Sequence, residues 1–322
     1  MLGTLSVTAP IFLLILLGYV AVRVGWLAYD GTATLSRYAL SFALPALMFS
    51  TLAQRPLHEV IVPPFFIAYA AGSLLAFGIG LIVAALVRRT HPLDNAFFGM
   101  GVAMSNSGYI GYALIAQLFG ESLLIAVAMS ILTEVVLIMP LTLILAELHS
   151  SRGQNGLAHT LKLVLLRVVK NPILQSIVAG LLVAQLGWSL PAFVDRTISM
   201  LAGSAAAVAL FAIGGTLVGQ RLREGLGGAL AIAAGKLIVH PAAVLALLVV
   251  VPAFDPTLTQ AALILSALPM VTIFPLLAQR YGQEAICSSA LVITTLLSFV
   301  TLNLWLWALG VGSAAPGLVG YW

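Results

Sequence analysis

The chain has 322 residues, of which 61% are hydrophobic and only 7% are Asp, Glu, Lys or Arg. Because a soluble domain carries about 25% charged residues, this composition excludes a soluble enzyme, a nucleic-acid-binding protein and a disordered chain. The mean hydropathy of +1.13 indicates a polytopic membrane protein instead. The single cysteine, Cys287, excludes an intramolecular disulfide and a multi-cysteine metal site.

Apolar runs of membrane-spanning length follow one another along the chain, and none shows the alternation of a strand. Lipid permits only helices and closed barrels as spanning structures, so these runs predict helices. The first run has no positive charge over Met1–Pro10, so we expect a retained span rather than a signal peptide. Ten transmembrane helices are expected, over 4–24, 34–53, 60–87, 95–118, 122–147, 172–188, 194–219, 229–252, 257–279 and 286–310.

A basic connector over 149–170 separates the fifth expected span from the sixth. Its later part alternates leucines and cations, as an interfacial helix does. The connector divides the chain into two five-helix repeats, 1–148 and 171–322. Because each half has an odd number of spans, any structural repeat must be inverted. Pro10 then pairs with Pro172, although coincidence among 15 prolines is the alternative explanation.

The positive-inside rule predicts the orientation of these spans. If the N-terminus is outside, the outer joints hold only Arg55 and Arg196. We therefore predict a multi-pass protein of the cytoplasmic (inner) membrane with both termini on the outer side. The basic residues that then fall on the cytoplasmic joints are Arg23, Arg37, Arg88, Arg89, Arg152, Lys162, Arg167, Lys170, Arg221, Arg223 and Arg280.

The fourth and ninth expected spans contain helix-breaking residues near their middles. In the fourth, polar residues stand beside glycines, and in the ninth, Pro269 and Pro275 each lack a backbone N–H. Non-helical backbone at membrane depth survives only where protein or a water-filled cavity covers it. Two interruptions in matching positions of the halves indicate the binding site of a transporter. The alternative is two kinked helices with a purely structural role.

Helices that begin at such breaks direct partial positive charge toward the membrane centre, which favours an anion. The sequence therefore predicts a substrate site for an anion at the two breaks. The predicted substrate-binding residues are Ser105, Asn106, Ser107, Gly108, Tyr109, Pro269, Thr272 and Pro275.

Three ionisable residues lie inside expected spans, where buried charge is costly and indicates function. Lys236 and His240 are four residues apart and share one helix face. Lys236 either balances an anionic substrate or replaces a coupling cation, or it is a structural tie to backbone carbonyls or to Glu134. His240 is a packing residue or a proton carrier. Glu134 either serves proton or sodium coupling or forms a salt bridge with Lys236, and we expect no metal and no other cofactor.

Several segments together resemble the auxin efflux carrier family of secondary transporters, in its bacterial, malonate-transporter-like branch. The resemblance runs through all ten expected spans, and the order and spacing of its pieces are more specific than any one of them. The matching pieces are Arg37–Phe49, Asn106–Gly111, Lys170–Ile173, Gly180–Leu182, Ala205–Gly214, Lys236–Pro241, Ala267–Met270, Leu277–Gly282 and Thr294–Ser298.

This resemblance implies an all-α fold similar to that of bile-acid/sodium symporters, with two inverted five-helix repeats. Spans 1, 2, 6 and 7 would form a scaffold that often dimerises, so a homodimer is expected. Spans 3–5 and 8–10 would form a moving transport domain in which broken spans 4 and 9 cross. The chain departs from the family pattern at Ala113, Ala207 and Ile273, where many members carry proline, proline and asparagine.

Members of the family carry organic anions, including auxin in plants and malonate in bacteria. The resemblance therefore implies a secondary transporter of small carboxylates that uses an elevator-type alternating-access mechanism. Its expected partners are the anionic substrate and the lipid bilayer, with no nucleic acid. A channel or a substrate sensor on the same fold is the alternative. An enzyme is not expected, because the chain has no nucleophile–base or metal-ligand motif.

Overall fold

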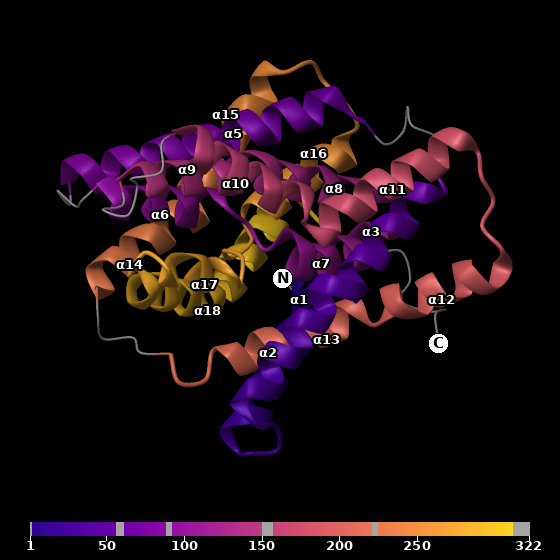
Figure 1. The fold of residues 1–322 in the computed structure, drawn as a ribbon, viewed down its shortest axis with the longest axis horizontal. Coiled ribbons are helices and arrows are strands. Elements are labelled where there is room, and N and C mark those ends of the chain that lie inside the picture. The colour runs from indigo at the N-terminus through magenta and orange to yellow at the C-terminus, as the bar shows by residue number, and fades with distance from the viewer. Residues whose placement is uncertain (1, 56–60, 88–91, 150–156, 221–224, 312–322) are drawn as a thin grey trace.

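The computed structural model describes residues 2–55, 61–87, 92–149, 157–220 and 225–311. Every regular element in these ranges is a helix (Figure 1), as the apolar runs predict. In the first half the elements are α1 (Leu2–Arg23), α2 (Tyr29–Tyr38), η1 (Ala39–Ala43), α3 (Leu44–Ala53), α5 (Pro63–Ile82), η2 (Val83–Val87), α6 (Pro92–Ala103), η3 (Ser107–Gly111), α7 (Tyr112–Phe119), η4 (Glu121–Leu123), α8 (Leu124–Thr133), η5 (Glu134–Ile138) and α9 (Met139–His149).

In the second half, too, every regular element of the described residues is a helix. The η segments are π-helical turns, except for η4, which is a 3₁₀ turn. The elements of the second half are α10 (Leu157–Val169), α11 (Pro172–Leu186), α12 (Ala192–Gly203), α13 (Ala205–Thr216), α14 (Leu226–Ala234), η6 (Gly235–Val239), α15 (His240–Val250), α16 (Pro256–Ser266), α17 (Phe274–Gln279) and α18 (Glu284–Ala308).

Within the described residues, six helical stretches are long and apolar enough to cross a membrane. The pair formed by α10 and α11, which bends by 60°, adds a seventh if it is counted as one span. The protein is therefore a multi-pass membrane protein. The six stretches are Gly3–Arg23, Pro63–Leu86, Glu121–His149, Ala192–Thr216, Leu226–Val250 and Glu284–Ala308.

The four other expected spans are helical but are not single apolar helices of spanning length. The spans expected at 95–118 and 257–279 are each broken in the middle, and α11 has only 15 residues. The span expected at 34–53 is divided among α2, η1 and α3. The ten-span count and its inverted pairing therefore stay predictions. Of the basic residues that predict the orientation, Arg88, Arg89, Arg152, Arg221 and Arg223 lie outside the described residues.

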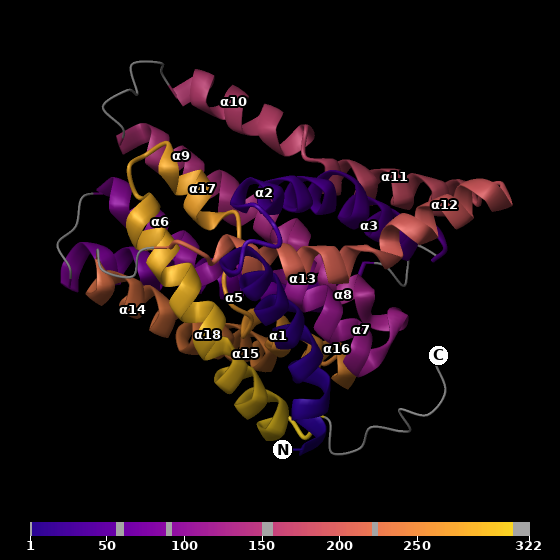
Figure 2. The same cartoon turned by 90° about the horizontal axis from the view of Figure 1, so that it is seen from below.

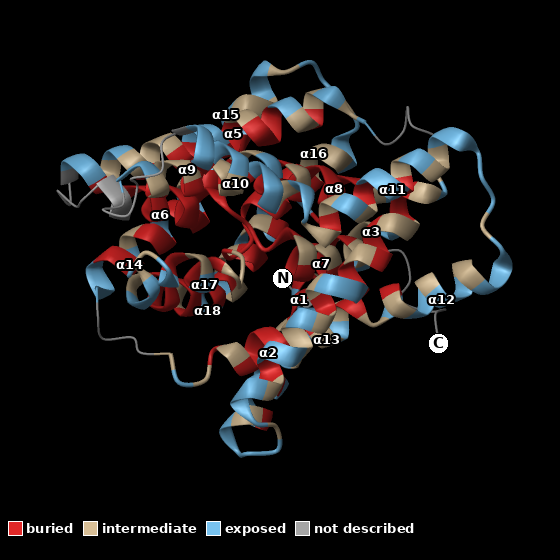
Figure 3. Ribbon diagram, in the orientation of Figure 1, coloured by how far each residue is buried: buried red, intermediate tan, exposed pale blue. Residues whose placement is uncertain are grey.

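The helices pack into two groups. Helix α1 packs against α13, and α3 packs against α11 and α12, whereas α5 packs against α6 and α15, and α14 packs against α18. Figure 2 shows α10 at one edge of the molecule, beyond α9. Buried residues concentrate on α5, α6, α8 and α16, and exposed ones on the outer helices (Figure 3). Much of that outer surface is apolar, including Leu13 and Leu16 of α1, as a lipid-facing surface requires.

Candidate functional site

The interruptions of spans 4 and 9 lie directly against each other. Helix α6 ends at Ala103 and η3 begins at Ser107, while α16 ends at Ser266 and α17 begins at Phe274. The backbone N–H of Asn106 donates a hydrogen bond of 2.9 Å to the carbonyl of Pro269. The side-chain amide of Asn106 donates another, of 3.1 Å, to the hydroxyl of Thr272. We call this meeting point of the two breaks the crossing.

The predicted prolines have different positions at the crossing. Pro269 lies in the non-helical segment between α16 and α17, and its carbonyl accepts the Asn106 hydrogen bond. Pro275 lies in the first turn of α17, where a missing N–H costs no helical hydrogen bond. It therefore starts a helix after the break rather than kinking one.

The remaining predicted residues of span 4 line the start of η3. Ser105 and Ser107 are fully buried, and Asn106 is nearly so. Gly108 and Tyr109 lie on η3 itself, and the carbonyl of Asn106 accepts from the N–H of Gly111. Thr272 is only partly buried. In this conformation the residues around Asn106 are buried, and the partly exposed ones are Gly108 and Val271–Ile273.

Lys236 connects both breaks to η6. Its fully buried ammonium donates to the hydroxyl of Ser105 at 2.6 Å and to the carbonyl of Ser266 at 2.9 Å, and it lies 2.6 Å from Nδ1 of His240. An ammonium has three N–H donors, so all three are used. His240 contacts the hydroxyl of Ser73 on α5 through Nε2, at 2.9 Å. Lys236 thus ties the end of α16 to the segment before Asn106.

Glu134 contacts the crossing through Ser107. It is the first residue of η5, is 4% exposed, and accepts a hydrogen bond of 2.6 Å from the hydroxyl of Ser107. Glu134 and Lys236 interact electrostatically. Among the described residues, however, no ion pair within 4.0 Å joins them. The acid and the base therefore bind the two serines that flank Asn106, rather than each other.

These polar groups share an unusual backbone setting. Ser107, Glu134 and Lys236 all stand on π-helical turns, namely η3, η5 and η6. A π-helical turn interrupts the regular i→i−4 pattern and changes where side chains point, and such turns are frequent at functional sites. The sequence contains no pattern that identifies these turns.

A groove on the surface lies away from the crossing. Its volume is about 360 Å³, and it runs between α3, α11 and α12, with Gln175 and Ser176 as its polar residues. Since it contains no titratable group, it is a weaker candidate than the crossing for an anion site. Its lining residues are Pro45, Ala46, Phe49, Gln175, Ser176, Ala179 and Ile198.

The sequence model of the family described as "Membrane transport protein" matches residues 5–306. The chain belongs to this family. The predicted resemblance to the auxin efflux carriers is thereby confirmed, and the protein is a transporter rather than an enzyme.

Relatives of this transporter support the same conclusion. A "Putative malonate transporter" of Rhizobium meliloti (strain 1021) is 29% identical over 297 residues, which cover 91% of this chain and 92% of the relative. An "Uncharacterized transporter" of Methanothermobacter thermautotrophicus is 26% identical over 312 residues, which cover 94% of this chain and 98% of the relative. A "Lysosomal cholesterol signaling protein" of Mus musculus is 24% identical over 92% of this chain, which spans 36% of that protein.

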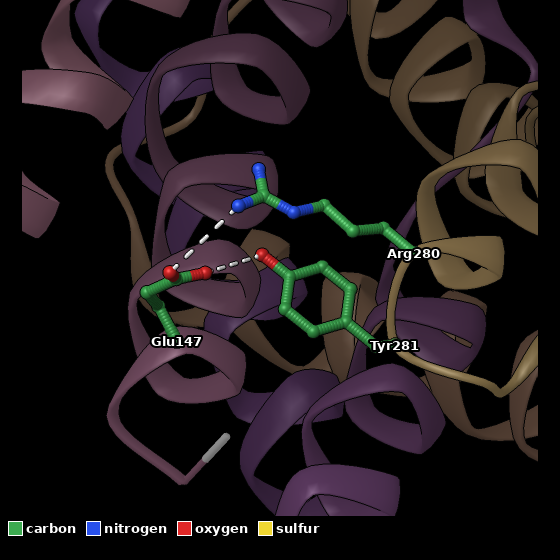
Figure 4. A network of polar contacts seen from close by, with 3 residues as sticks. All are labelled: Glu147, Arg280 and Tyr281. Carbon is green, nitrogen blue, oxygen red and sulfur yellow. Dashed lines mark hydrogen bonds and ion pairs between the residues drawn. The ribbon is translucent and has the colours of Figure 1, made fainter. Parts of the chain in front are cut away.

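A polar cluster that sequence reasoning missed joins two elements of the transporter at one end (Figure 4). Glu147, near the end of α9, accepts a hydrogen bond of 2.9 Å from the hydroxyl of Tyr281, and Arg280 lies 4.0 Å from its other oxygen. Burial, together with the nearby Glu147 carboxylate, raises the pKa of Tyr281 above its usual value. Arg280 and Tyr281 belong to one of the segments that resemble the family, but nothing in the sequence pairs them with Glu147.

Proposed function

We propose that this transporter carries small organic anions, carboxylates such as malonate or auxin-like acids, across the cytoplasmic membrane. The observation that carries the proposal is the crossing, where Asn106 bonds both Pro269 and Thr272 across two interrupted spans. Helix η3–α7 begins there, and the first N–H groups of a helix favour negative charge. The name of the Rhizobium relative supports malonate as the first compound to test.

The packing of the helices supports an elevator-type mechanism. Helices α1, α3, α11, α12 and α13 pack mainly among themselves, and so do α5, α6, α14, α15 and α18. In the proposed mechanism the first group is a fixed scaffold, and the second carries the crossing across the membrane against it. A scaffold of this kind is also the surface proposed for a homodimer.

The test of the site is malonate binding and vesicle uptake by Asn106→Ala. This change removes the amide that reaches Thr272, so we expect loss of saturable uptake and at least about tenfold weaker binding. Asn303→Ala is a matched control, because Asn303 is also buried but bonds Thr8 on α1, far from the crossing. It should lower thermal stability and keep the malonate affinity. Unchanged uptake by Asn106→Ala would contradict the site assignment.

A binding protein without transport is the second candidate, and the name of the mouse relative, a signaling protein, favours it. Malonate uptake into vesicles that are preloaded with malonate distinguishes a carrier from a binding protein. A carrier accelerates uptake when malonate is present on the opposite side, whereas a sensor binds malonate without flux. Flux that does not saturate would indicate a channel.

A further inference from the structure

The crossing contains two buried side chains that balance each other. Lys236 is fully buried and Glu134 is 4% exposed, and the two interact electrostatically. When Lys236 is an ammonium and Glu134 a carboxylate, their net charge is zero. An anion bound at Asn106 and Thr272 would add uncompensated negative charge in a place of low dielectric constant, which costs free energy. One proton added near the anion removes that cost.

We infer that Glu134 takes up this proton when an organic anion binds, so that anion and proton move together. The inference rests on the proposed function. The proton comes from the aqueous side, and a new O–H bond forms at a Glu134 carboxylate oxygen. The ammonium of Lys236, no longer balanced by Glu134, then compensates the anion.

Lys236 and His240 are poor acceptors for the added proton. All three N–H donors of an ammonium at Lys236 are used, by Ser105, Ser266 and His240. Nδ1 of His240 then accepts from that ammonium, so Nε2 carries the hydrogen and donates to Ser73. A second proton on His240 would face the ammonium directly. Only Glu134 has room for a proton without a new clash of like charges.

Unused acceptors lie beside Glu134. The hydroxyls of Tyr69 and Ser130 are buried and have no hydrogen-bond partner. Tyr69 interacts electrostatically with Glu134 and lies near Ser130. Buried polar groups are nearly always paired, so orphaned ones need a reason. A protonated carboxyl gains a donor that these oxygens can accept.

The other titratable groups around Glu134 do not change this assignment. Tyr69 is the titratable side chain of α5, Tyr109 that of η3, and α8 has none. On α9, Glu147 and His149 are at least thirteen residues further along the chain, roughly 20 Å along a helix. Lys236 is the charged side chain that interacts electrostatically with Glu134.

The test measures protons taken up per malonate bound. Purified protein in weakly buffered detergent solution with a pH indicator is mixed with malonate at the same pH, and the measurement is repeated over a series of pH values on both sides of neutrality. At pH values where Glu134 is charged in the free protein, the wild type should take up about one proton per bound malonate. Glu134→Gln, which mimics the protonated acid, should bind malonate while taking up almost no protons from solution. Glu147→Gln, the matched carboxylate at the end of α9, should behave as the wild type does.

Three results would overturn the inference: malonate binding without proton uptake by the wild type at every pH of the series, proton uptake retained by Glu134→Gln, or a sodium requirement in place of the proton. Should Glu134→Gln not fold, Ser107→Ala provides a second measurement. It removes the donor that stabilises the charged carboxylate, so the pH midpoint of proton uptake should rise by about one to two pH units. An unchanged midpoint would also overturn the inference. Absence of malonate binding in the wild type contradicts the proposed function instead.

Discussion

Asn106 is held between two serines that each bond a buried ionisable side chain. Lys236 bonds Ser105, and Glu134 bonds Ser107, so the backbone around Asn106 is fixed from both sides. Unwound backbone in a membrane protein needs such partners, because no water or regular helix satisfies it. The charges are therefore structural supports of the crossing as well as candidates for coupling.

Replacing Lys236 by methionine tests this support. The change leaves Ser105, the Ser266 carbonyl and His240 without their common donor, and it leaves the Glu134 carboxylate uncompensated. We expect a loss of about 3–5 kcal/mol in the free energy of unfolding. Adding Glu134→Gln should restore part of the loss, because the unpaired charge is then removed. Strictly additive effects in thermal denaturation would show that the two residues are not coupled.

At the scale of elements, close packing between α1 and α13 depends on glycine. A Cβ added to Gly214 would lie 1.8 Å from the carbonyl oxygen of Ile15, and one at Gly18 would lie 1.9 Å from that of Phe211. Both obstacles are backbone atoms, which cannot rotate away. The sequence shows several small residues in this region, but only the packing shows which of them touch another helix.

Gly214→Ala should therefore destabilise the transporter, by about 1–3 kcal/mol for an overpacked core. Gly203→Ala, at the end of α12, is the matched control, since no atom lies within 4 Å of the added Cβ. It should leave the melting temperature unchanged or raise it, because alanine favours helix. Equal melting temperatures for the two variants in detergent would contradict the close contact.

At the scale of the whole molecule, the predicted orientation assigns the α11–α12 joint to the outer side and α10 to the cytoplasm. Trp188 and His159 are both exposed and stand in these two segments. After Cys287→Ser, a membrane-impermeant thiol reagent should label Trp188→Cys in intact cells. His159→Cys should react only after the cells are permeabilised. The reverse labelling pattern would show that the protein has the opposite orientation in the membrane.

The sequence by itself determined that this is a multi-pass helical transporter and where its helices break. Composition excludes a water-facing surface. Pro269 and the polar residues around Asn106 mark the breaks through their own backbone preferences, whatever packs against them, and Pro275 marks the start of the helix that follows the second break. The breaks themselves marked the residues of the crossing as candidates, and the family resemblance agreed with them. The structure brings Asn106, Pro269 and Thr272 into contact.

Only the tertiary structure decided how the polar groups pair. Lys236 and Glu134 are on different helices, so the sequence left a direct salt bridge open, whereas their hydrogen bonds go to Ser105 and Ser107. The π-helical turns that carry Ser107, Glu134 and Lys236 arise from packing and have no residue signature. Partners more than a hundred residues apart, such as Lys236 and Ser105, are chosen by the fold, because local propensity carries no information about distance through space.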